Sequence, residues 1–231
     1  VRNARLAKLH ELGIIGLNVS LSAHARPWAR EERREWQSDR MEAYAAMVDA
    51  MDQGIGRVVA ALRETGQLDN TLILYVHAGG ASDSEAHSSQ PRRTREGIPP
   101  AEVRPPGAVQ LDKVPEHTRD GKPVRWGRGI SPGPADTYVE LGREWANAAN
   151  TPFRLYRGYT HEGGIATPMI AHWPQGITRA GALERQPAHL IDLMPTLLEI
   201  AGAKYPETFH DDQEIHPLEG VSLVPSFTEQ P

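Results

Sequence analysis

A long amphipathic helix followed by a continuous apolar run constrains the fold of this chain more than any other feature. From about Arg30 to Arg63, apolar residues recur at steps of three and four, so they share one helix face: Met41, Tyr44, Val48, Met51, Ile55, Val58 and Leu62. We expect this face to pack against the core. The run from Thr71 to Val76 is typical of a strand covered on both faces. The succession predicts an α/β architecture with a parallel sheet.

Three further elements can be placed from local patterns. Leucines at helical spacing predict a short helix over about Arg2 to Leu12. The apolar run Met169 to Trp173 predicts a second strand, which the proline after it ends. Asp192 is a suitable N-cap for a helix that stops at Gly202. Between these elements, residues 86–136 form a long irregular insertion rich in Pro, Gly, Arg and Ser. We expect Trp126 and Trp145 to dock at least part of it, which leaves two interpretations: a segment that shapes a ligand cleft or a surface excursion.

Composition excludes several classes of protein. The chain has 231 residues, a net charge of −5 and no basic stripe with interleaved aromatics, which argues against a nucleic-acid partner. Mean hydropathy is −0.50 and no apolar run reaches the roughly 20 residues of a membrane span, so we expect no span. With no cysteine, disulfides, thiolate metal sites and cysteine nucleophiles are excluded within these residues.

Two segments carry the polar residues expected of a site. In α/β folds, ligands gather beyond the carboxyl ends of the strands, which directs attention to the residues after Val76, from His77 to Glu85. The other segment begins at Arg157 and brings a cation, a tyrosine, His161 and a carboxylate together within six residues. Gly163 and Gly164 follow, and they permit either unusual backbone conformations or a close approach to a neighbouring segment.

Several motifs in one order resemble the later part of the sulfatase family, specifically its bacterial arylsulfatase branch. They are Met47 to Arg57, Gly66 to Tyr75, Asn150 to Tyr156, the Glu-Gly-Gly stretch from Arg157 to Pro174, and Leu190 to Gly202. The resemblance extends from about Arg2 to Phe227. It implies an alkaline-phosphatase-like sandwich, with a mainly parallel sheet flanked by helices. Residues 1–231 would then form one partial sulfatase domain, incomplete at its N-terminus.

The resemblance also implies two cofactors. Sulfatases attack the ester with a formylglycine made from a Cys or Ser in a Cys/Ser-x-Pro-x-Arg motif, and we expect that segment to lie before Val1. They hold a calcium or similar divalent cation partly with an Asp-Asn pair at the end of the strand. Aligning Gly80 with the family's glycine puts Ala78 and Gly79 at these ligand positions, and neither has a side-chain oxygen. Asp83, or Glu85, is the substitute if the loop takes another course; otherwise both are solvated loop carboxylates.

The family's substrate-contacting lysine corresponds to Arg157. A guanidinium can grip a sulfate oxyanion with two parallel hydrogen bonds, but it does not readily give up a proton. Arg157 is therefore the expected sulfate contact and catalytic residue. His161 is a second substrate-binding and catalytic candidate, and His77 a further catalytic one. The alternatives are a surface cation for Arg157 and a structural histidine for His161.

Three functions follow from the resemblance. The first is a sulfuric ester hydrolase acting on a sulfate-ester small molecule or a sulfated glycan. The second is a non-catalytic, degenerate or truncated sulfatase-like module, which the residues at 78 and 79 favour. The third is a phosphoesterase of the same fold, which the motifs fit less well. We expect the isolated chain to be inactive, and the family implies a periplasmic or extracellular location.

Overall fold

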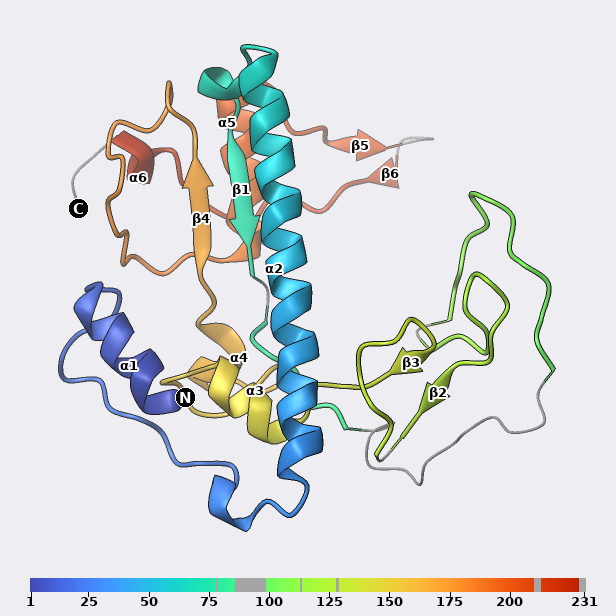
Figure 1. The fold of residues 1–231 in the computed structure, drawn as a ribbon. Coiled ribbons are helices and arrows are strands. Elements are labelled where there is room, and N and C mark those ends of the chain that lie inside the picture. The colour runs from blue at the N-terminus through green and yellow to red at the C-terminus, as the bar shows by residue number, and fades with distance from the viewer. Residues whose placement is uncertain (78, 86–98, 113, 128, 210–212, 229–231) are drawn as a thin grey trace. The chain divides into compact units, whose positions relative to one another are not determined.

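The computed structural model describes residues 1–231 except 78, 86–98, 113, 128, 210–212 and 229–231. Its helical elements in chain order are α1 (Arg2–Glu11), η1 (Trp28–Arg30), α2 (Arg34–Glu64), η2 (Leu68–Asn70), α3 (Arg143–Ala149), α4 (Glu162–Ile165), η3 (Leu190–Asp192), α5 (Leu193–Ala201) and α6 (Pro225–Thr228). Its strands are β1 (Ile73–Val76), β2 (Arg125–Trp126), β3 (Thr137–Tyr138), β4 (Met169–His172), β5 (Thr208–Phe209) and β6 (Gln213–Glu214) (Figure 1). None of the described helices combines the length and the apolar character that crossing a bilayer requires.

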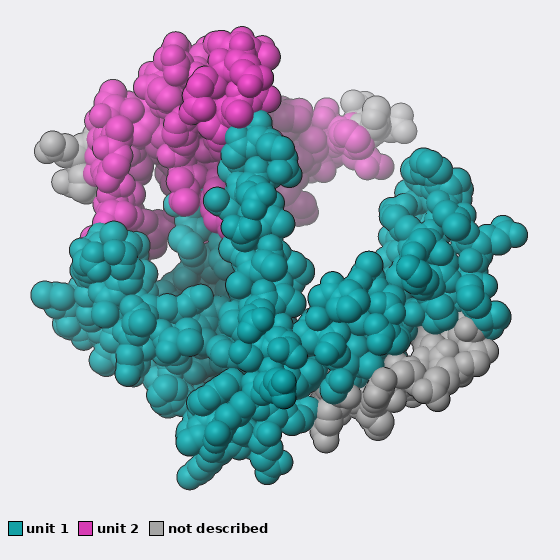
Figure 2. Space-filling model, viewed as in Figure 1, with its two compact units in different colours: residues 1–57, 76–169 teal, residues 58–75, 170–231 magenta. Residues whose placement is uncertain are grey.

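The chain divides into two compact units (Figure 2). Unit 1 comprises residues 1–57 and 76–169, and unit 2 comprises residues 58–75 and 170–231. The division falls inside α2 and at the ends of β1 and β4. Every candidate site residue named above, from His77 to His161, therefore belongs to unit 1.

The long helix α2 forms as its periodicity predicts, with Glu35 in its first turn and Arg63 in its last, as the helix dipole favours. The burial predicted for its apolar face is wrong over much of its length. Val48 and Met51 are 41% and 44% exposed, and Ile55 is exposed as well. The 3.6-residue period identifies which face is apolar, but it does not reveal whether another element covers that face.

The two longest strands, β1 and β4, pair with each other in antiparallel fashion. At one end the backbone N–H of His77 donates to the Pro168 carbonyl, and at the other the N–H of Gln175 donates to the Asp69 carbonyl. Residue numbers therefore rise along one strand as they fall along the other, and the arrows in Figure 1 point in opposite directions. The pair β5–β6 is also antiparallel, and β2–β3 is parallel.

The expected mainly parallel sheet is thus not confirmed by the described strands. The apolar run of β1 suggested burial on both faces, but all four of its residues are only half-buried. Strand direction depends on the connection to the partner strand. Here that connection is the long segment between Val76 and Met169 rather than a single crossover helix, so the helix–strand succession did not determine it.

The core of unit 1 lies around α3. Ala146, which is fully buried, packs with Ala81 and Tyr156, and Leu155 lies against this cluster. These residues come from α3, from the loop after β1 and from the segment before Arg157. The core therefore joins the two segments in which the sequence places the candidate site.

Part of the 86–136 insertion packs against the rest of unit 1, as the presence of Trp126 predicted. Trp126 is buried together with Val124 and Ile130. The indole N–H of Trp36 in α2 donates to the Ile130 carbonyl at 2.8 Å. Outside the insertion, the indole N–H of Trp145 donates to the Gln37 carbonyl at 2.8 Å. Hydrogen bonds thus connect both Ile130 of the insertion and Trp145 to the first turns of α2.

Unit 2 joins η3 and α5 to the segment before α6. Thr196 is almost fully buried, and its hydroxyl donates to the Asp192 carbonyl at 2.6 Å while accepting from the Leu223 N–H at 2.8 Å. Helix α5 stops at Gly202, as the sequence predicted, and this glycine caps the helix in a left-handed conformation with φ +61°.

Candidate functional site

The candidate site is the place where the loop after β1 meets the segment that contains Arg157. The backbone N–H of Arg157 donates to the Ala81 carbonyl at 3.0 Å. A Cβ added to Gly79 would lie 3.5 Å from Arg157 Cγ and 3.7 Å from Nε, so the arginine side chain lies alongside Gly79. The position that corresponds to the family's metal-binding asparagine and the position of its substrate-contacting lysine are therefore adjacent in this structure.

The guanidinium of Arg157 is exposed, and it forms no hydrogen bond or ion pair with another described residue. Its backbone, by contrast, is fixed on both sides. Tyr156, immediately before it, belongs to the buried core cluster, and its ring meets Tyr159 edge to face with centroids 6.1 Å apart. Burial raises the pKa of the Tyr156 phenol, which further favours its neutral form. The arrangement presents a cation to solvent from a rigid base.

The Glu-Gly-Gly stretch begins the short helix α4, and its two glycines pack closely against backbone carbonyls. A Cβ on Gly163 would overlap the Leu155 carbonyl oxygen, and a Cβ on Gly164 would overlap that of Tyr159. Of the two roles that the sequence left open for these glycines, the close approach is the one realised. Only residues without a side chain allow the turn to fold back onto residues 154–159.

The loop after β1 is fastened a second time, at its far end, by a buried arginine. Arg40 in α2 has a side chain that is 1% exposed and donates through Nε to the Glu140 carbonyl at 2.9 Å. Its Nη1 lies 3.3 Å from Glu85 Oε1, and the Ser84 hydroxyl donates to Glu140 Oε1 at 2.7 Å. Burial lowers the pKa of Arg40, and the nearby Glu85 carboxylate opposes that shift.

The contact between Arg40 and Glu85 limits which side chains of this loop are available to the metal ion expected from the family. Glu85 is engaged by Arg40, Gly79 offers no side-chain oxygen, and Ala78 lies outside the described residues. Asp83 is half-buried in the same loop. Within the described residues no three His, Asp or Glu side chains converge as a metal ion requires. The described residues around Gly79 therefore do not fit a calcium ion, which takes six to eight oxygen ligands.

The side chains of His77 and His161 take no part in the hydrogen bonds between described residues that hold the backbone around Arg157. His77 is exposed, and its backbone N–H extends the β1–β4 ladder. His161 is exposed at the N-cap of α4, where its carbonyl accepts from the Gly164 N–H at 2.7 Å. Neither imidazole forms a hydrogen bond with a described residue. The structure thus brings Arg157 and Gly79 together, and it shows no contact that joins His77 or His161 to them.

Sequence reasoning did not identify Asn150. This residue follows α3, and its side chain forms three hydrogen bonds that link the loop after β1 to the segment around Arg157. No local pattern marks it, because an asparagine at the end of a helix is ordinary. Only the tertiary structure reveals the role.

The formylglycine segment is expected before Val1, but the Ser-x-Pro-x-Arg form of its motif also occurs once within the chain, as Ser89-Gln-Pro-Arg-Arg93. It follows β1 in the sequence, and it lies in residues 86–98, outside the described part. The expected position of the formylglycine segment, before Val1, remains a prediction.

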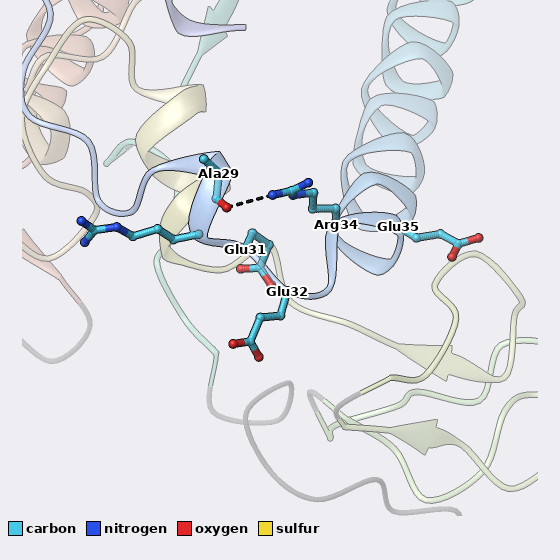
Figure 3. A pocket seen from close by; sticks show the side chains of 6 residues that line it. Ala29, Glu31, Glu32, Arg34 and Glu35 are labelled. Atoms are coloured by element: carbon cyan, nitrogen blue, oxygen red, sulfur yellow. Dashed lines mark hydrogen bonds between the residues drawn. The ribbon is translucent and has the colours of Figure 1, made fainter.

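A surface depression in unit 1 lies away from the candidate site residues. It is lined by Ala29, Arg30, Glu31, Glu32, Arg34 and Glu35, at the start of α2 (Figure 3). Arg34 reaches across to donate to the Ala29 carbonyl at 2.8 Å, while Glu32 and Glu35 point outward. None of the candidate site residues lines it. The depression is open, and charged side chains make up most of its lining.

Comparison with known proteins identifies the class to which this site belongs. The sulfatase family profile matches residues 19–203, which is most of the chain and includes both segments of the site. The chain therefore belongs to the sulfatase family, and this membership implies an α/β fold of the alkaline-phosphatase type.

Individual relatives agree. The chain is 29% identical to an uncharacterized sulfatase of Schizosaccharomyces pombe over 89% of its own length and 34% of the relative's. It is 28% identical to an arylsulfatase of Klebsiella aerogenes over 96% of its length and 43% of that protein's. It is 26% identical to the steryl-sulfatase of Mus musculus over 76% of its length and 20% of that protein's. The chain thus spans less than half the length of these relatives.

Proposed function

We propose that this chain forms the later part of a sulfuric ester hydrolase and supplies Arg157 as its contact to the sulfate group. One observation carries the proposal. The Arg157 guanidinium is exposed, and its stem lies against Gly79 directly after β1, where ligands gather in α/β folds. Family membership gives this cation its expected partner, because sulfatases act on sulfate esters.

The chemistry of Arg157 is that of an anion holder. Its planar fork can donate two parallel hydrogen bonds to sulfate oxygens, and its charge offsets the negative charge that grows as the ester bond breaks. It stays protonated throughout, so it does not act as the acid that protonates the leaving oxygen. His161 and His77 are the groups proposed for proton transfer. In the family, a formylglycine supplies the nucleophile when present.

Sulfate binding tests the proposal directly. We expect the purified chain to bind inorganic sulfate, with saturable shifts of the Arg157 Nε–H resonance in NMR spectra. Arg157→Ala should abolish this binding, and Arg157→Lys should weaken it, because lysine keeps the charge but loses the two-point geometry. The matched control is Arg154→Ala, since Arg154 is an exposed arginine three residues earlier. Equal sulfate affinity in Arg157→Ala and the unaltered chain would refute the proposal.

The second candidate function is a non-catalytic sulfatase-like module. The observation that favours it is the absence of a ligand oxygen at Gly79 together with the engagement of Glu85 by Arg40. On this basis the 231-residue chain is expected neither to hydrolyse a chromogenic aryl sulfate nor to bind calcium stoichiometrically. Turnover clearly above a buffer control, or calorimetric calcium binding lost in Asp83→Ala, contradicts this expectation.

The Ser89 pattern calls for its own control. If the chain does turn over an aryl sulfate, Ser89→Ala decides whether that serine supplies the nucleophile. Mass spectrometry of the corresponding peptide would show whether the hydroxymethyl group of Ser89 has been oxidised to an aldehyde. We expect the unmodified serine.

In a longer protein that also carries a formylglycine segment, restoring the family pair with Ala78→Asp and Gly79→Asn should raise sulfatase activity. The left-handed φ of +80° at Gly79 is one that asparagine tolerates better than most residues. The substrate class proposed is a sulfate-ester small molecule or a sulfated glycan. The proposed location is the periplasm or the cell exterior, which cell fractionation would test.

A further inference from the structure

Asn150 makes an unusual set of hydrogen bonds for a residue at a helix end. Its side-chain oxygen accepts from the Ala81 backbone N–H at 2.9 Å. Its side-chain nitrogen donates to the Leu155 carbonyl at 3.0 Å and to the Gly163 carbonyl at 2.9 Å. The amide orientation is unambiguous, because its oxygen faces an N–H and its nitrogen faces two carbonyls.

These three bonds join the three segments that form the site. Ala81 lies in the loop after β1, Leu155 lies two residues before Arg157, and Gly163 lies in the Glu-Gly-Gly turn. Ala81 in turn accepts the backbone N–H of Arg157 at 3.0 Å. A continuous path of hydrogen bonds thus runs from the Asn150 side chain through the Ala81 peptide to the backbone of Arg157.

The side chain also supports a backbone conformation that is unfavourable on its own. Leu155 has φ +64°, a left-handed conformation that costs a non-glycine residue roughly 1–2 kcal/mol. Its carbonyl is placed between the Asn150 amide and the α-carbon of Gly163, where no side chain would fit. Such conformations persist only where surrounding contacts determine them, and they concentrate at functional sites.

We propose that Asn150 is a positioning residue for the sulfate-binding cation: its carboxamide holds the loop after β1, the turn at Leu155 and the Glu-Gly-Gly turn in the register that presents Arg157 beside Gly79. The inference rests on the proposed function in so far as Arg157 binds sulfate. Asn150 itself is not a substrate contact. Its role is to fix the base from which the guanidinium extends.

Helix capping does not account for these contacts. The cap of α3 uses the backbone of Asn150, whose N–H donates to the Ala146 carbonyl at 2.9 Å. The side chain is left free for the three tertiary bonds. A second asparagine on the same helix provides the contrast: Asn147 is 4% exposed and accepts from the Ala25 N–H at 3.3 Å. Among the described residues, the Asn147 side chain forms no hydrogen bond with the loop after β1 or with the Arg157 segment.

The experiment compares three variants of the 231-residue chain: Asn150→Ala, Asn150→Asp and the control Asn147→Ala. Asn150→Ala removes all three bonds. Asn150→Asp keeps an acceptor for the Ala81 N–H, but it turns a carboxylate oxygen toward two carbonyls and loses both donors. Each variant is measured in two ways: by amide hydrogen exchange at Ala81 and Arg157, and by NMR titration with inorganic sulfate.

We expect Ala81 and Arg157 amides to exchange about tenfold faster in Asn150→Ala than in the unaltered chain, because the partly buried hydrogen bond of the Ala81 N–H is lost and the neighbouring Arg157 bond loosens. In Asn150→Asp the Ala81 amide should stay protected. Sulfate affinity should fall by roughly tenfold in both Asn150 variants, because a displaced guanidinium no longer meets the anion squarely. Asn147→Ala should leave exchange at Ala81 and Arg157 and sulfate affinity unchanged, whatever it does to global stability.

The two measurements separate the two claims. If the unaltered chain binds no sulfate, the proposed function fails, and the exchange rates alone decide whether Asn150 positions Arg157. Unchanged exchange at Arg157 in Asn150→Ala overturns the positioning role. So does a fall in sulfate affinity in Asn147→Ala equal to that in Asn150→Ala, since the effect would then follow from general destabilisation of α3.

Discussion

A methyl group added at Gly80 should destabilise the chain far more than the same methyl group added at Gly79. Both glycines have left-handed backbones, with φ +68° and φ +80°, so an alanine costs roughly 1–2 kcal/mol at either position for conformation alone. The surroundings differ. At Gly79 the new Cβ meets Arg157 Cγ at 3.5 Å, an ordinary contact with a flexible side chain. At Gly80 it overlaps the Gly163 carbonyl oxygen, which belongs to the backbone.

The magnitude follows from that difference. The overlap at Gly80 forces either the loop after β1 or the Glu-Gly-Gly turn to move, and overpacking of this kind costs about 1–3 kcal/mol. Movement also strains the bond between Asn150 and Gly163, which is worth about 1 kcal/mol. We therefore expect Gly80→Ala to lose about 3–6 kcal/mol and Gly79→Ala about 1–2 kcal/mol. The first value is a large part of the 5–15 kcal/mol that holds a typical domain folded.

Urea unfolding followed by tryptophan fluorescence measures both variants. Trp28, Trp36, Trp126 and Trp145 lie in unit 1 with the two glycines, so the signal reports mainly on that unit. The difference between the variants is the informative quantity, because the conformational cost common to both cancels. A difference below about 0.5 kcal/mol, which is the range of neutral substitutions, would refute the close approach of the two loops.

Three further predictions concern other parts of the chain. Thr196→Val should destabilise unit 2 by about 1–2 kcal/mol in urea unfolding, because it leaves the partly buried Leu223 N–H without its hydroxyl partner, whereas Thr196→Ser keeps the hydroxyl and should cost less. Asp136→Asn should cost about 0.5–1 kcal/mol near neutral pH, because the pKa of Asp136 is lowered by its hydrogen bonds to Arg125 at 2.7 and 3.0 Å. Because the pKa of Asp136 is lower in the folded state than in the unfolded state, its ion pair stabilises the fold fully only above the unfolded-state pKa. The cost of Asp136→Asn should therefore fade as pH falls below about 4, which urea unfolding at a series of pH values would measure. A cost that does not change with pH contradicts this prediction. Met51→Gln should change stability by less than about 0.5 kcal/mol, because Met51 is 44% exposed; a loss of several kcal/mol would show that its face is covered.

Local patterns predicted the elements of this chain well. The helix expected over Arg30 to Arg63 is α2 at Arg34–Glu64, and the strand expected over Thr71 to Val76 is β1 at Ile73–Val76. Gly202 ends α5 in the left-handed conformation expected of a helix stop. These features depend on hydrophobic period, capping and backbone preference, which act over a few residues and can be read directly from the sequence.

Burial and strand direction were not predictable in the same way. The face of α2 that contains Val48 and Met51 is apolar as expected, yet it is exposed, because burial depends on what packs against a helix rather than on the helix itself. The antiparallel pairing of β1 with β4 depends on how the chain returns after almost a hundred residues. No window of sequence contains that information.

The candidate site likewise contains one residue that the sequence could predict and one that it could not. Arg157 could be placed near the end of β1 because motif order and the strand-end rule both act through the fold as a whole. Asn150 could not, because its bond to Ala81 links residues 69 positions apart in the chain. The Asn150 side chain matters because the backbone groups of Ala81, Leu155 and Gly163 all lie within its reach. That proximity depends on long-range contacts, which the sequence does not reveal.

The two neighbouring glycines refine the comparison with metal-binding sulfatases. Gly80, which corresponds to the glycine of the family motif, has no room for a side chain, so the close approach to Gly163 is a constraint that the loop retains. Gly79, which we align with the family's asparagine, has space for a Cβ beside the Arg157 side chain and a backbone conformation that asparagine tolerates. The structure at Gly79 thus combines a backbone conformation that asparagine tolerates with space for a Cβ, although the residue itself supplies no ligand oxygen. A single substitution there should add an amide oxygen without rebuilding the loop, whereas relocating the ligand to Glu85 would require breaking its contact with Arg40.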